Sequence, residues 1–169
     1  MTNSTGSMRL ARMASLLTMA ITGCTSLAPA ALPRGSNITE ARRALVAPTG
    51  EHALPGGGTR LEYAQGSFGR QTFMLDFDPG GALVSTQQVL TEANFATIRP
   101  GMPAAEVRLR LGRPAHVFGV SWQQLQVWNY RFAGGDCVWF QVSIGNATQQ
   151  VTEAGIGTDP ACNAPNPKN

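Results

Sequence analysis

Hydrophobic positions recur at the helical period between Ile98 and Pro114. Ala104, Val107 and Leu111 fall at positions i, i+3 and i+7, which places them on one face of a helix. The charged residues of this stretch lie off that face. The pattern therefore predicts a turn followed by a short amphipathic helix, with Pro103 at its first position. The other residues that mark its start and end are Gly101, Gly112 and Pro114.

Two further helices are predicted from weaker patterns. Residues 38–45 repeat the helical period, with Asn37 as the N-cap and Glu40 at the third helical position, the arrangement of a capping box. Residues 91–96 form a short helical turn capped by Thr91.

Alternating patterns predict antiparallel strands. In residues 71–78, Phe73, Leu75 and Phe77 share one face, which is typical of a half-buried strand. Residues 137–144 alternate in the same way. The Pro- and Gly-rich segment 47–58 is predicted to be a loop, and residues 115–125 are assigned no element. The predicted strands are 60–64, 71–78, 82–89, 126–132, 137–144 and 148–156.

Residues 78–81 read as a hairpin turn between two of these strands. The acidic spacing of Asp76, Asp78 and Gly80 also resembles the start of a calcium loop. That alternative lacks the third acidic position and the terminal glutamate. The turn is therefore the preferred interpretation.

The two halves of the chain share one order of elements and several residues at nearly constant spacing. Gly35, Glu40 and Leu45 lie 66 positions before Gly101, Glu106 and Leu111. The strand residues Tyr63 and Phe73 lie 67 positions before Tyr130 and Phe140, a drift of one residue. Chance similarity is the alternative to duplication. Each half is small for an independent core, so the halves are expected to pack together.

The N-terminal segment has the pattern of a targeting sequence. Arg9 and Arg12 precede an apolar run that ends at Gly23 and is too short to span a bilayer. The sequence from Ile21 to Cys24 resembles a bacterial lipobox, which implies lipidation of Cys24 and cleavage before it. An ordinary secretory signal with a chance cysteine is the alternative. Several acyl chains give stable membrane anchoring.

Charge excludes one class of partner. The chain has 169 residues, with 13 basic and 10 acidic. Cleavage after residue 23 removes two arginines and leaves 146 residues with 11 basic and 10 acidic. A nucleic-acid-binding protein needs a basic stripe that such a chain lacks, so no nucleic-acid partner is expected.

With Cys24 lipidated, Cys137 and Cys162 remain as a pair in an oxidising compartment. We predict that they form a disulfide that ties the C-terminal tail to a central strand. Two free thiols and a metal-binding pair are the alternatives.

The second half resembles the BamE family, also called SmpA/OmlA, of small outer-membrane lipoproteins. The resemblance covers roughly residues 90–156, and the lipobox agrees with it. The matching residues are Leu90, Thr91, Phe95, Ile98, Gly101, Met102, Val107, Leu111, Gly112, Pro114, Trp128, Tyr130 and Phe132.

This resemblance implies an α+β fold built from BamE-like units, each with short helices packed on a three-stranded antiparallel sheet. It implies a non-catalytic role in the machinery that assembles β-barrel outer-membrane proteins, contributing to envelope integrity. The implied partners are subunits of that complex and phosphatidylglycerol. The implied location is the outer membrane, lipid-anchored and facing the periplasm.

Two features depart from the family, which usually carries one unit and no such disulfide. A tandem arrangement is similar to the secreted β-lactamase inhibitor protein, so an inhibitor or binding protein is the second hypothesis. The expected organisation is a signal peptide (1–23), a tether (24–33), a degenerate first unit (34–90), a second unit (91–162) and a disordered tail (163–169).

The sequence offers little for catalysis or for a cofactor. His52 and His116 are its only histidines, and it has neither a zinc-protease motif nor a serine nucleophile elbow. The three consecutive glycines at 56–58 lack the lysine of a phosphate loop. We expect no enzyme activity, no cofactor and no metal site.

The candidate binding residues are arginines and tryptophans. The arginines form either a solvated helix face or a contact with anionic lipid or an acidic partner. Trp128 is expected in the core, while Trp139 points opposite Phe140 and is expected at the surface, where Trp122 is a further candidate. The candidate arginines are Arg99, Arg108, Arg110 and Arg113.

Overall fold

The computed structural model describes residues 1, 28–134, 137–159 and 162. The fold is α+β, with two four-stranded antiparallel sheets in the orders β1-β2-β3-β4 and β5-β6-β7-β8. The expected three-stranded sheets are therefore wrong, because each sheet has a fourth strand. The first half contains η1 (Pro29–Ala31), α1 (Ile38–Ala44), β1 (Gly50–Ala53), β2 (Thr59–Ala64), β3 (Thr72–Phe77) and β4 (Leu83–Gln88). The second contains α2 (Glu92–Phe95), α3 (Ala104–Leu111), β5 (His116–Val120), η2 (Ser121–Gln123), β6 (Leu125–Arg131), β7 (Val138–Gly145) and β8 (Val151–Thr158).

The two unexpected strands, β1 and β5, occupy the same place in each half. β1 lies inside the segment predicted to be a loop, and β5 lies in the segment given no element. Both are edge strands, and none of their residues is buried. A strand without a buried face has no apolar alternation to reveal it, so pairing with the neighbouring strand defines it instead.

The predicted helices are present with their predicted caps. Asn37 forms the full capping box with Glu40 at the start of α1. The Thr91 hydroxyl accepts a hydrogen bond from the Asn94 amide at the start of α2. Pro103 is the N-cap of α3 rather than its first residue. The three residues of its apolar stripe, Ala104, Val107 and Leu111, are buried as predicted.

In each half, a set of main-chain hydrogen bonds joins the segment that leads into the main helix to the start of the last strand and the turn before it. We call these bonds the edge clamp. In the first half the amide of Gly35 donates to the carbonyl of Leu83 at 2.9 Å, and the amide of Leu83 donates to Ser36 at 2.9 Å. The amide of Ile38 donates to Gly81 at 2.9 Å. The equivalent bonds of the second half join Gly101 to Val151, Val151 to Met102 and Ala104 to Gln149, at 2.8, 2.9 and 2.9 Å.

Other backbone details recur at the same spacing. Gly35 and Gly101 have φ angles of 83° and 85°. The pairing of β3 with β4 shifts register at Asp76/Phe77, and that of β7 with β8 shifts 67 positions later, at Ser143/Ile144. The halves thus share their element order, edge clamp and β-bulge. We call residues 28–90 and 91–162 the first and second units.

Gly101→Ala is expected to lower the free energy of unfolding by about 1 kcal/mol, because the left-handed φ is unfavourable for a residue with a Cβ. No atom lies within 4 Å of the added Cβ, so the effect comes from the backbone and not from a clash. Gly155→Ala is the control, since its Cβ also meets nothing within 4 Å and its φ lies outside the left-handed region. Urea titrations that give equal changes for the two variants would contradict this explanation.

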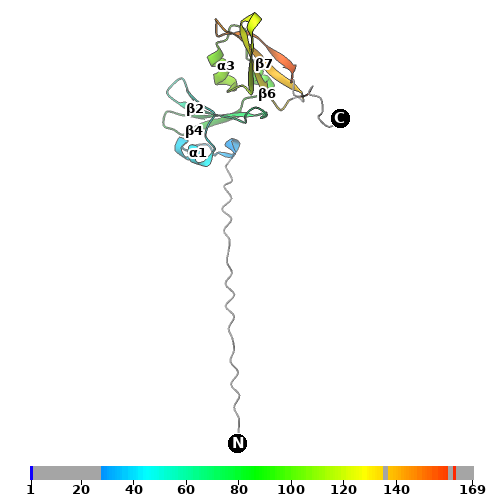
Figure 1. Ribbon diagram of the computed structural model, residues 1–169. Coiled ribbons are helices and arrows are strands. Elements are labelled where there is room, and N and C mark those ends of the chain that lie inside the picture. Colours follow the sequence, from blue (N-terminus) through cyan, green and yellow to red (C-terminus); the bar gives the residue numbers. More distant parts are fainter. Residues whose placement is uncertain (2–27, 135–136, 160–161, 163–169) are drawn as a thin grey trace.

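Each unit has its own hydrophobic core, and the first sheet contributes to both. Leu61, Leu75 and Phe77 pack with α1 in the first core. Met74 points to the opposite face of that sheet and joins the second core, with Leu111 and Tyr130. In Figure 1, α1 accordingly lies on one side of β2 and β4, and α3, β6 and β7 lie on the other. The first sheet is therefore covered on both faces.

The predicted disulfide between Cys137 and Cys162 is present, with a Cα–Cα distance of 5.5 Å. Leu32, expected in the tether, is buried in the first core, so the folded part begins before residue 34. The predicted signal peptide (apart from Met1), Cys24 and the tail 163–169 lie outside the described residues. In the described part of the chain, no helix has the length and hydropathy needed to span a membrane.

Candidate functional site

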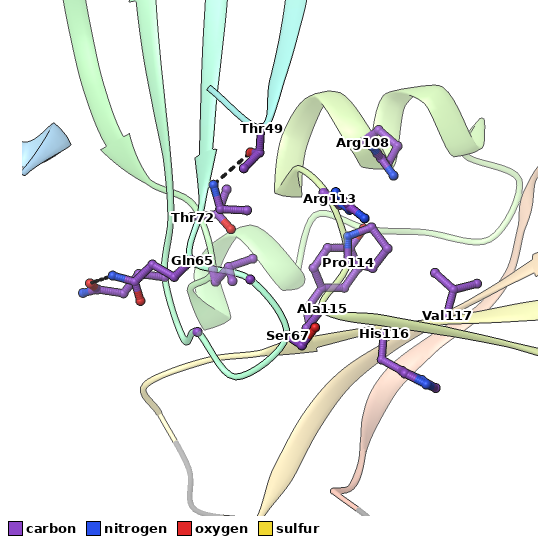
Figure 2. Close-up of a pocket in the computed structure, with 16 residues that line it drawn as sticks. Thr49, Gln65, Ser67, Thr72, Arg108, Arg113, Pro114, Ala115, His116 and Val117 are labelled. Carbon is purple, nitrogen blue, oxygen red and sulfur yellow. Dashed lines mark hydrogen bonds between the residues drawn. The ribbon is translucent and has the colours of Figure 1, made fainter. Parts of the chain in front are cut away.

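A cleft of about 530 Å³ lies where the two units meet. The first unit contributes the end of β2, the loop after it and the start of β3. The second unit contributes α3 and the segment that leads into β5. Figure 2 shows Thr49, Gln65 and Thr72 on the left of the cleft and Arg108, Arg113 and His116 on the right. The lining residues are Thr49, Ala64, Gln65, Gly66, Ser67, Gly69, Gln71, Thr72, Leu90, Arg108, Arg113, Pro114, Ala115, His116, Val117 and Tyr130.

The charge of this cleft is basic. Its described lining includes two arginines and one histidine, and no aspartate or glutamate. The guanidinium of Arg108 lies 5.8 Å from the ring centroid of Trp128, which holds it in place by a cation–π contact. Within the described residues, neither Arg108 nor Arg113 forms an ion pair. Both guanidinium groups are therefore available to an anionic ligand.

Tyr130 provides a neutral part of the lining. Its hydroxyl donates to the carbonyl of Gly112 at 3.2 Å. Burial raises the pKa of Tyr130 and outweighs the opposing effect of the Arg108 charge. The phenol therefore stays protonated, and it fixes the end of α3 instead of acting as a base.

A buried carboxylate, which the sequence did not reveal as important, fixes one wall of the cleft. Glu62 on β2 is fully buried. Its Oε1 accepts the backbone amide of Arg113 at 2.7 Å and the hydroxyl of Thr49 at 3.1 Å. Its Oε2 lies 3.0 Å from Nε2 of His52. The bond to Arg113 joins the first sheet to the segment directly after α3, so Glu62 sets how the units meet.

Arg60 makes a second contact between the units. It binds both carboxylate oxygens of Asp76 at 2.6 and 2.7 Å. Its remaining Nη1 donates to the carbonyl of Leu109 at 2.8 Å, near the C-terminal end of α3. A cation at that end of a helix satisfies a carbonyl that lacks an intrahelical partner and interacts well with the helix dipole. Arg60 and Glu62, two residues apart on one face of β2, thus hold α3 from both sides of its terminus.

The structure does not bring the four candidate arginines together. Arg108 and Arg113 line the cleft. Arg110 pairs with Glu106 at 2.7 Å, and Arg99 lines a different hollow. Residues two apart on a helix face opposite sides, which separates Arg108 from Arg110.

The expected surface position of Trp139 is wrong. Trp139 does point opposite Phe140, but its side chain is only 6% exposed. The Arg131 guanidinium covers it at 4.7 Å from the ring centroid and is itself covered by Phe68 at 5.1 Å. Arg131 is held there by Asp159, at 2.7 Å. A loop of the first unit and the segment after β8 thus bury a face that the pattern assigned to solvent.

The other two tryptophans also differ in exposure. Trp122 is 82% exposed, as a candidate interface residue would be. Trp128 was expected in the core, and it is partly buried against the second core. Its ring carries Arg108 on one face, so it contributes to both the core and the cleft.

A second hollow, of about 380 Å³, lies between α2 and the end of β8. Its lining is mostly apolar, from Phe95, Ile98, Phe140 and Ile156, with Glu92 and Arg99 as its charged members. The two opposite charges leave it without the basic character of the cleft.

The described residues offer no assembled group of metal ligands. Among them, no cluster of three or more His, Cys, Asp or Glu side chains could hold a metal ion. His52 is bonded to Glu62, and His116 lies beside the aromatic rings of Phe118 and Trp139. The turn at 78–81 closes by a bond of the Ala82 amide to the Asp78 carboxylate, as expected of a hairpin.

No protein-family model and no curated protein matches this chain. Among solved structures, the chain is similar to a cysteine-rich secretory protein from Staphylococcus aureus, with 11% identity and a TM-score of 0.28. The match covers 76% of this chain and 45% of that protein, so this chain spans less than half of its length. A similarity of this size carries no argument about fold or function.

Proposed function

We propose that this protein is a non-catalytic outer-membrane lipoprotein that assists the machinery assembling β-barrel proteins and so contributes to envelope integrity. A lipid on Cys24 holds it to the membrane, and the folded units face the periplasm. The observation that carries this proposal is the BamE-like sequence of residues 90–156, together with the lipobox that precedes it.

The geometry of the cleft supports a binding role. Its walls come from both units and are fixed by the buried contacts of Glu62 and Arg60. Its two accessible guanidinium groups are suited to holding an anionic group. A preformed cleft with a few placed polar or charged groups is typical of a binding site.

The test is co-purification from envelopes solubilised in mild detergent. We expect the core and lipoprotein subunits of the barrel-assembly complex to be recovered with the full-length protein. A Cys24→Ser variant, which cannot be lipidated, is expected to recover much less, because the anchor keeps the protein at the membrane. Recovery of unrelated proteins, with no barrel-assembly subunit, would contradict the proposal.

A second candidate function is inhibition or sequestration of a soluble enzyme, as in the tandem-unit β-lactamase inhibitor protein. The presence of two equivalent units with a cleft between them favours it. The same co-purification separates the two candidates, since this one is expected to yield a single soluble hydrolase.

A further inference from the structure

The outer edge of β5 lies beside the basic cleft and has no strand paired to it within the described residues. β5 pairs only with β6, through the register from His116–Asn129 to Val120–Leu125. His116 and Val117 of this strand also line the cleft. An edge strand presents unpaired N–H and C=O groups, which can template a further strand.

The first unit provides an internal comparison, because β1 is the equivalent edge. β1 carries Glu51, which pairs with Arg42 at 2.7 Å, and His52, which is bonded to Glu62. Charged side chains on an edge are a common protection against unwanted pairing. The edge strand of the first unit is therefore guarded.

β5 has no such protection. It contains no lysine, arginine or carboxylate, and it exposes Val117 and Phe118 at 45% and 41%. Successive residues of a strand point to opposite faces, so the two side chains offer apolar contacts on both sides of the edge. The exposed Trp122 follows directly after the strand. Of the two equivalent edge strands, β1 carries protecting charged side chains and β5 does not.

The charge of the cleft indicates what would pair with this edge. Arg108 and Arg113 line the same cleft as His116 and Val117 of β5, and neither arginine forms an ion pair within the described residues. A guanidinium group matches the geometry of a carboxylate and binds it through two hydrogen bonds. Added strands in known complexes take affinity from the main chain and specificity from such side-chain contacts.

We infer that β5 and the basic cleft form one docking site for an extended, acidic segment of a partner polypeptide. The segment would add to the second sheet beside β5 and place a carboxylate against Arg108 and Arg113. This inference rests on the proposed protein-binding role and specifies the chemistry of the partner. A lipid headgroup would leave the strand edge unpaired, and the β5 strand of a second copy brings no carboxylate.

The experiment selects peptides from a random display library on the full-length protein in detergent micelles. We expect the enriched peptides to contain aspartate or glutamate followed by alternating apolar residues. The best peptide, once synthesised, should slow hydrogen exchange of the β5 amides. Enriched peptides without acidic residues, no enrichment at all, or unchanged exchange in β5 would overturn the inference.

Variants separate the two parts of the site. Arg113→Glu and Arg108→Glu are each expected to weaken binding of that peptide about tenfold or more, since each removes a charge-assisted contact. Arg113 is exposed, so its variant remains informative if loss of the Arg108–Trp128 contact impairs folding. Phe118→Lys should also weaken binding, because a charged side chain on β5 disfavours the pairing of a further strand. Val84→Lys, at a site 45% exposed on β4, is the control and should bind as the unchanged protein does.

Other occupants give distinct outcomes. Flotation with phosphatidylglycerol vesicles that depends on Arg108 and Arg113, without competition by peptide, would replace the inference with a lipid site. Dimers that Phe118→Lys abolishes would indicate a second copy at β5. Co-purification of barrel-assembly subunits equally with Phe118→Lys and the unchanged protein would refute the docking site and leave the proposed function standing. Peptide binding as expected, without co-purification of barrel-assembly subunits, would support the docking site and refute the proposed function.

Discussion

Glu62→Ala is expected to lower the free energy of unfolding by about 3 kcal/mol, a large effect for one side chain. The substitution removes a fully buried carboxylate that accepts from the Arg113 amide and the His52 ring. The Thr49 hydroxyl loses one of its two acceptors and keeps the carbonyl oxygen of residue 62. Donors that lose their partner in a partly buried place carry a desolvation cost, and removal of the fully buried side chain also leaves a void. Denaturant titration followed by circular dichroism measures the change.

Glu62→Gln is the matched control, because the amide has nearly the same shape and keeps one acceptor oxygen. Its Oε1 can still accept from Arg113 and Thr49, so we expect less than half of the loss seen with alanine. Equal and small effects of the two substitutions would show that Glu62 does not hold the units together. Equal and large effects would show that the charge matters more than the hydrogen bonds.

Replacing both Cys137 and Cys162 with serine is expected to lower the free energy of unfolding by about 3 kcal/mol on the chain-entropy view of cross-links. The two residues are separated by 25 positions, and the bond fixes the segment that holds Asp159 against Arg131. The unfolding midpoint in urea is the measurement.

A reductant provides the control for this second prediction. Dithiothreitol should move the midpoint of the unchanged protein to that of the double variant and leave the variant itself unchanged. A reductant that destabilises both proteins equally would indicate an effect unrelated to the disulfide. We also expect Trp139 fluorescence to shift toward that of an exposed indole in the double variant, because Arg131 loses part of its support.

The sequence predicted those elements whose buried faces follow a clear period. α3 was predicted from the stripe of Ala104, Val107 and Leu111, and β3 from its alternating Phe73, Leu75 and Phe77. β1 and β5 were missed because no residue of either strand is buried. Hydrophobic periodicity marks buried faces. An edge strand that is held only by main-chain hydrogen bonds on one side has no buried face, so its sequence shows no such period.

The candidate site was predicted less completely, because it depends on how the units pack. Arg108 and Arg113 were candidates from their proximity in sequence, but their separation from Arg99 and Arg110 follows from the direction of each side chain. Glu62 gave no signal, since a glutamate between Leu61 and Tyr63 reads as the solvent face of a strand. In the folded chain that face is covered by the second unit. Long-range packing of this kind leaves no local pattern.

The edge clamp has a consequence for how such a chain can grow. Since Gly35 and Leu83 are bonded, as are Gly101 and Val151, the segment before the main helix of each unit lies beside the last strand of that unit's own sheet. A copy inserted in tandem can therefore fold beside its parent without threading through it or opening an existing sheet. The short connection from β4 to α2 is enough to join the two units. The molecule is in this sense modular, and the clamp of each unit leaves the strand at the opposite edge of its sheet, β1 or β5, free to differ from its counterpart.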